Sequence, residues 1–118
     1  MSYRKDWEAH EKALARMAIK PKIFKGDLGD AYDAWEKADQ TVRKDKASDP
    51  KALKKLKEAR TEKYTNAALI INTYSQYLTG LQKKSDAETT PMQRTVIEPA
   101  LDFLGFTMGT MRMPENKQ

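Results

Sequence analysis

Apolar residues recur at helical spacing along most of the chain, and the alternation typical of strands is nearly absent. Near the start, Trp7, Leu14 and Met17 fall on one side of a helix that we predict over about residues 2–19. This helix ends before Pro21, because a proline disfavours helical backbone in the residue that precedes it. The first segment therefore indicates an amphipathic helix with a narrow apolar side.

A second helix is predicted over about residues 28–47, where Leu28, Trp35 and Val42 are spaced seven apart. Alanines stand between these large side chains, and such alternation suits close packing against another helix. Several aspartates lie in the first turns, where carboxylates complement the positive end of the helix dipole. We therefore expect this helix to bury its apolar side against a neighbour.

A third and longer helix is predicted over about residues 50–84. Ser48 or Asp49 is suited to cap its start, and Pro50 fits the first turn, where the missing N–H would have no partner. A helix of about 33 residues is roughly 50 Å long, so we expect an elongated molecule. Two basic residues stand where the apolar pattern calls for apolar side chains, namely Arg60 and Lys63.

The last helix is predicted over about residues 98–112. Pro91 is a plausible restart of structure, but Pro99 interrupts the segment, and an internal proline breaks or kinks a helix. We therefore expect the helix to begin at Glu98 and Pro99 rather than to run from Pro91. Residues 114–118 are expected to form a disordered tail.

These elements predict an all-α protein, an elongated antiparallel helical hairpin within a three- or four-helix bundle. The length of 118 residues suits one domain, which we place at residues 1–113. The two long helices are joined by a short turn around residues 47–50, so their apolar sides face each other like a coiled coil. The residues expected to be buried between them are Trp35, Leu53, Leu56, Ile70, Tyr74 and Leu78.

Composition narrows the function classes. The chain has no cysteine and one histidine, which excludes disulfides, thiolate ligands and most histidine-based catalytic sites. No apolar run reaches the length of a membrane span, and the charged N-terminus does not resemble a secretory signal. We therefore expect a soluble, cytoplasmic protein that is no enzyme and holds no cofactor; export by a signal-free route stays open.

Two polar features were weighed as metal or catalytic sites. His10 shares the apolar side of the first helix with Trp7, so we expect a packed histidine rather than a ligand. Acidic residues recur every third position in the second helix, but a three-residue step winds around a helix instead of lining one side. We therefore predict a solvated surface and no metal site for this row, which comprises Asp27, Asp30, Asp33, Glu36 and Asp39.

The net charge of +5 is confined to residues 43–63, around the turn of the predicted hairpin. A basic end of this kind can attract nucleic acid, anionic lipid or an acidic protein surface. It lacks interleaved aromatic residues and any nucleic-acid-binding motif, so unspecific attraction fits better than base reading. The candidate anion- or nucleic-acid-binding residues are Arg43, Lys44, Lys46, Lys51, Lys54, Lys55 and Lys57.

The C-terminal segment is unusually rich in methionine and phenylalanine, and methionine is common at adaptable binding surfaces. Its apolar residues are too dense for one helical side. We expect Phe103 and Phe106 to point partly outward and to contact another chain. The candidate partner-binding residues are Leu101, Phe103, Leu104, Phe106, Met108 and Met111; the alternative is that the segment belongs to the chain's own core.

The sequence thus favours a non-enzymatic helical protein that acts by protein–protein contact, by self-association or by docking on a larger partner, through its hairpin and its apolar C-terminal segment. The alternative is a nucleic-acid-binding hairpin that uses the basic end at residues 43–63.

Overall fold

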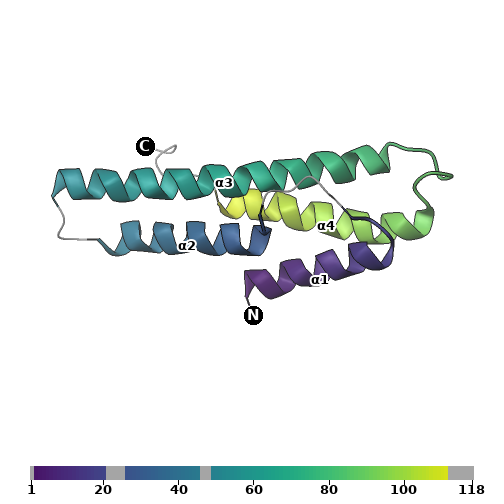
Figure 1. Cartoon of the computed structure of the whole chain (residues 1–118), viewed down its shortest axis with the longest axis horizontal. Helices are drawn as coiled ribbons and strands as arrows, with labels where there is room; N and C mark the ends of the chain where they lie inside the picture. Colours follow the sequence, from purple (N-terminus) through teal and green to yellow (C-terminus); the bar gives the residue numbers. More distant parts are fainter. Residues whose placement is uncertain (1, 21–25, 46–48, 112–118) are drawn as a thin grey trace.

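The computed structural model describes residues 2–20, 26–45 and 49–111, and these form four α-helices and no strand (Figure 1). The helices are α1 (Tyr3–Arg16), α2 (Leu28–Lys44), α3 (Pro50–Gln82) and α4 (Pro91–Thr110). The predicted all-α class is confirmed, and α1, α2 and α3 end within a few residues of the predicted ranges. The tail predicted at residues 114–118 lies outside the described residues.

Each helix begins at a side chain that caps its free N–H groups. The Ser2 Oγ accepts from the N–H of Lys5 at 3.2 Å, and the Asp49 Oδ1 accepts from the N–H of Ala52 at 2.8 Å. Asp27 caps α2 in a similar way. Such caps satisfy donors that have no partner within the helix, so helix starts can be read from local sequence.

The start of α4 differs from the prediction, because this helix runs continuously from Pro91 through Pro99. Thr90 and Gln93 form a capping box, in which each side chain accepts a hydrogen bond from the backbone N–H of the other. Pro99 lies on the exposed side, where water can reach the carbonyl that loses its helical partner. The expectation of a start at Glu98 was therefore wrong.

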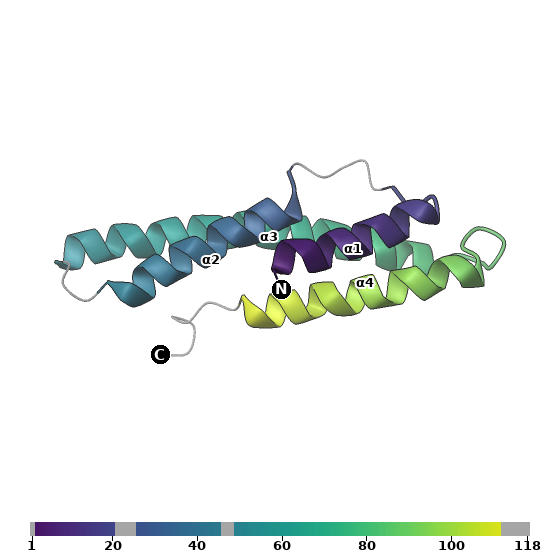
Figure 2. The same cartoon turned by 90° about the horizontal axis from the view of Figure 1, so that it is seen from below.

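The molecule is elongated, with extents of 59 × 26 × 22 Å, and α2 and α3 form the antiparallel hairpin (Figure 1). α1 and α4 lie beside the second half of α3, and α4 ends near the middle of the molecule (Figure 2). We call α1, α4 and residues 67–82 of α3 the body. We call residues 36–44 of α2 and 50–66 of α3 the arm.

The buried apolar core lies in the body and at its junction with α2. It contains Trp7 and Leu14 of α1, Ile70 and Leu78 of α3, and Leu104 of α4. An apolar core of this kind forms where several helices pack together, because the apolar side of one helix needs more than one neighbour to be shielded from water.

Four of the six residues predicted to be buried are buried: Trp35, Ile70, Tyr74 and Leu78. Leu53 and Leu56 are only half-buried, and their predicted burial was wrong, because they lie in the arm rather than in the body. Tyr74 is covered by α1: its ring meets that of Trp7 edge-on, with centroids 4.8 Å apart.

Candidate functional site

The predicted basic residues lie at the end of the hairpin, on the last turns of α2 and the first turns of α3 (Figure 1). Lys46 lies outside the described residues, and Lys57 is partly buried. The other residues of this set are each exposed, namely Arg43, Lys44, Lys51, Lys54 and Lys55.

Both arginines of the basic stretch contact one buried carboxylate, that of Asp39. Arg60 Nη1 lies 3.1 Å from Asp39 Oδ1, and Arg43 Nε lies 2.7 Å from Asp39 Oδ2. Arg60 and Asp39 are both buried, whereas Arg43 is exposed. The accessible positive charge of this end is therefore carried mainly by lysines, which attract anions as point charges and do not form the bidentate contacts of arginine.

The arm has an unusual interior. In its described residues no apolar side chain is fully buried, and the two buried residues are Asp39 and Arg60. The apolar side chains of Val42, Leu53 and Leu56 are all partly exposed. A two-helix unit with this little apolar burial gains little stability from packing, since most helix stability in proteins comes from burial of an apolar side.

The structure separates the six predicted partner-binding residues of the C-terminal segment. Leu104 and Met111 are fully buried in the chain's own core, so neither is available to a partner in this fold. Phe106 is 72% exposed. The side chains that are partly buried and pack against the core are Leu101, Phe103 and Met108.

Phe103 was expected to point partly outward with Phe106; it is partly buried, and its ring packs against α1. Its ring lies 5.0 Å from that of Tyr3, 5.9 Å from that of Trp7 and 4.9 Å from the imidazole of His10. The aromatic residues of α1 therefore cover Phe103. Burial in this cluster lowers the pKa of His10, while the charge of Asp6 opposes the shift.

The acidic row of α2 does not remain a purely solvated surface. The guanidinium of Arg4 reaches across from α1 to the carboxylates of Asp27, Asp30 and Asp33; its Nη2 lies 2.9 Å from Asp33 Oδ2. Hydrogen bonds to Asp30 and Asp33 raise the pKa of Arg4. One guanidinium facing three carboxylates leaves this cluster with a net charge of about −2. In the part of the chain that the structure describes, no group of histidine and acidic side chains could hold a metal ion.

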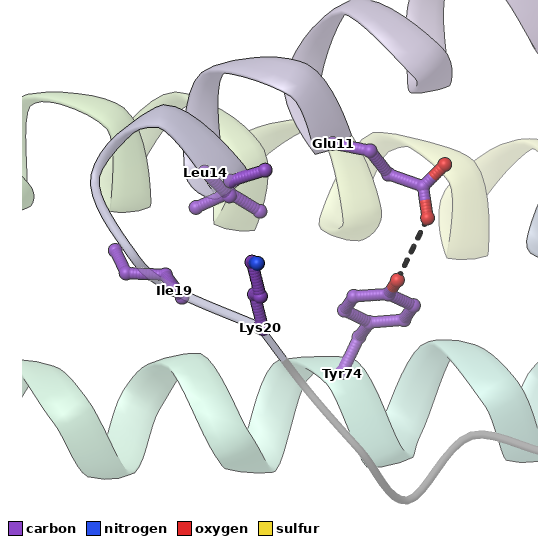
Figure 3. Close-up of a pocket in the computed structure, with 6 residues that line it drawn as sticks. Glu11, Leu14, Ile19, Lys20 and Tyr74 are labelled. Atoms are coloured by element: carbon purple, nitrogen blue, oxygen red, sulfur yellow. Dashed lines mark hydrogen bonds between the residues drawn. The ribbon is translucent and has the colours of Figure 1, made fainter.

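A cleft of about 310 Å³ lies between α1 and α3 and is lined by Glu11, Leu14, Ile19 and Tyr74, among others (Figure 3). The Tyr74 hydroxyl donates to Glu11 Oε2 at 2.9 Å, and burial, more than this hydrogen bond, raises the pKa of Tyr74. The ammonium of Lys20 points toward the cleft (Figure 3). Sequence reasoning missed this cleft, because its residues come together only when α1 packs on α3.

Comparison with known protein families, curated proteins and solved structures found no match. Within the described residues, every helix is too short or too polar to cross a membrane. The assignment of a function therefore depends on the surfaces described above.

Proposed function

We propose that this chain acts by protein–protein contact and not by catalysis, through its hairpin and the exposed end of α4. The observation that carries the proposal is the arm, whose described residues hold a buried ion pair and no fully buried apolar side chain. A buried ion pair contributes little net stability, because desolvation offsets the attraction. A partner that covers Val42, Leu53 and Leu56 would supply the apolar burial that the arm lacks.

Phe106 supports the same proposal. It is the most exposed large apolar residue among those described, at 72%, and lies about one turn before the end of α4. That end of α4 lies near the middle of the molecule (Figure 2). An exposed aromatic side chain on a small protein is typical of an interface, since aromatic residues dominate interface energetics.

Amide hydrogen exchange tests this proposal directly. In dilute protein we expect the amides of the arm to exchange much faster than those of residues 67–82 of the same helix, because local opening is easiest where little apolar surface is buried. Raising the protein concentration, or adding a partner, should slow exchange in the arm and leave the body unchanged. An arm that is as protected as the body in dilute protein needs no partner, and the proposal would then lose its basis.

A second candidate function is nucleic-acid binding by the basic end. Lys51, Lys54 and Lys55 support it, since all three are exposed on the first turns of α3. Binding of this kind weakens steeply with salt, because neutralised phosphates release counterions. Co-elution with duplex DNA at low and high salt tests it: salt-sensitive co-elution supports DNA binding, and elution unchanged by DNA at low salt excludes it.

A further inference from the structure

The arm is covered by fewer helices than the body. α4 lies along the second half of α3 and ends before the arm, and the backbones of α2 and α4 are not neighbours (Figure 2). Among the described elements, the body has three helices around its core and the arm has two. The arm therefore presents two helices whose apolar residues Val42, Leu53 and Leu56 are partly exposed.

The molecule is more extended than a compact domain of its size. Its radius of gyration is 16.9 Å, against about 13.5 Å for a compact domain of this length.

Opposite charges stand at the two ends of α2. Toward the hairpin turn lie Lys44 and, on the neighbouring turns of α3, exposed lysines such as Lys54. At the other end, Arg4 is outnumbered by the three aspartates that it contacts, and Glu36 follows on the same helix. From Asp33 to Lys44 the helix rises about 16 Å, so the two charged regions lie within one interface length.

This distribution determines which orientation of two arms is favourable. Two arms lying parallel would place lysines beside lysines, and like charges at an interface repel each other. Two arms lying antiparallel would place the lysines of each beside the acidic end of the other. The same arrangement brings the turn of one copy near the end of α4 in the other, where Phe106 is exposed.

We propose that the partner on the arm is a second copy of this chain, lying antiparallel, so that two arms form a four-helix unit with two-fold symmetry. This inference deepens the proposed function and rests on it. Each copy contributes the same surface, as symmetry requires of such a dimer. The interface combines the partly exposed Val42, Leu53 and Leu56 with contacts between lysines 51, 54 and 55 and the acidic end of α2.

Analytical ultracentrifugation of the full chain and its charge variants tests the arrangement. We expect the wild type to dimerise and the variant Lys51→Glu/Lys54→Glu/Lys55→Glu to dimerise at least about tenfold more weakly, since it places acids against acids. The matched control is Lys12→Glu/Lys83→Glu/Lys84→Glu, which has the same net charge but alters exposed lysines of the body and its end. The control should change the dimer affinity less than about threefold.

A rescue variant makes the test specific. Adding Glu36→Lys to the triple arm variant restores opposite charges in the antiparallel arrangement, so part of the lost affinity should return. Equal effects of the arm and control variants, or no rescue, would overturn the antiparallel pairing.

Small-angle X-ray scattering supplies the geometry. Two chains of 59 Å that overlap only along arms of ~25 Å give a dimer of about 90 Å, whereas full side-by-side overlap gives one of about 60 Å. A dimer of about 60 Å, or a chain that stays monomeric at about 100 µM, would overturn this inference. Rapid amide exchange in the arm of such a monomer would leave the proposed function standing, with another protein as partner. A monomer whose lysines bind duplex DNA would favour the second candidate function instead.

Discussion

Asp39 of α2 and Arg60 of α3 form an ion pair across the hairpin, with Oδ1 and Nη1 3.1 Å apart and side-chain exposures of 9% and 3%. The described arm contains no other buried side chain. If one helix slid along the other by a turn, this buried contact between opposite charges would be lost, which is costly. We infer that the pair fixes how α2 and α3 align. Buried polar contacts are better known for specifying such an alignment than for adding stability.

The first prediction concerns this pair. Asp39→Asn should lower the free energy of unfolding by about 3 kcal/mol, because it removes the negative charge that the buried Arg60 guanidinium contacts. Urea denaturation measures the loss. In dilute protein, where the chain is monomeric, Glu36→Gln alters an exposed acid one turn earlier and should change stability by less than about 0.5 kcal/mol.

Replacing both partners distinguishes alignment from stability. Asp39→Leu/Arg60→Leu should recover most of the stability lost by Asp39→Asn, since an apolar pair avoids desolvation. If Asp39→Asn were no more destabilising than Glu36→Gln, the pair would contribute nothing and the inference about alignment would fail.

The second prediction compares the body with the arm. Ile70→Ala should cost about 2–4 kcal/mol in unfolding free energy, because Ile70 is 4% exposed within the core. Leu56→Ala removes a side chain of similar size from the arm, where it is partly exposed, and should cost about 1 kcal/mol or less. Equal costs in dilute protein would mean that the arm is packed as tightly as the body.

Most of the fold could be predicted from local patterns. Apolar spacing locates the first three helices, and Asp49 with Pro50 marks the start of α3, because caps act within a few residues. α4 was mispredicted because the rule against internal proline is local as well. It could not weigh the capping box at Thr90 or the burial of Ile97 and Ala100 on either side of Pro99.

The candidate site was predicted only in part. The distribution of charge along the sequence locates the basic end. It does not reveal that Arg43 and Arg60 both form ion pairs with Asp39, since Arg60 lies 21 residues away from Asp39 in the sequence. The sequence did contain one indication of this buried ion pair: Arg60 stands on the apolar side of its helix, where an apolar residue is expected. The packing of Phe103 against α1 could not be predicted, because the apolar pattern of one helix does not reveal which neighbouring helix covers it.

The third prediction separates the two phenylalanines. Phe103→Ser should lower the free energy of unfolding by about 2 kcal/mol, because it removes a ring packed against Tyr3, Trp7 and His10. Phe106→Ser should change it by less than about 0.5 kcal/mol, because its ring is exposed. Thermal unfolding in dilute protein measures both.

Substitutions at two exposed residues of α4, Phe106 and Met92, should affect self-association differently. We expect Phe106→Ser to weaken self-association, and Met92→Ser, which alters a residue 66% exposed at the other end of α4, to leave it unchanged. Equal effects of these two variants would remove Phe106 from the proposed interface.

The fourth prediction concerns pH. Burial beside Trp7 and Phe103 lowers the pKa of His10 below its usual 6.5, against the opposing charge of Asp6. The unfolded chain therefore binds a proton more readily than the folded chain between the lowered pKa and 6.5. The buried, neutral His10 therefore contributes to the stability of the folded chain above pH 6.5, and this contribution is lost as the pH falls through that interval.

His10 is the only histidine, so one imidazole resonance in an NMR titration reports its pKa without assignment by mutation. We expect a midpoint below 6.5, and a lower one still in Asp6→Asn, because that change removes the charge that favours the imidazolium. His10→Gln should flatten the dependence of unfolding free energy on pH in the interval below 6.5. A midpoint at or above 6.5 would mean that the imidazole is solvated, and that α1 and α4 do not enclose it as the ring contacts with Phe103 require.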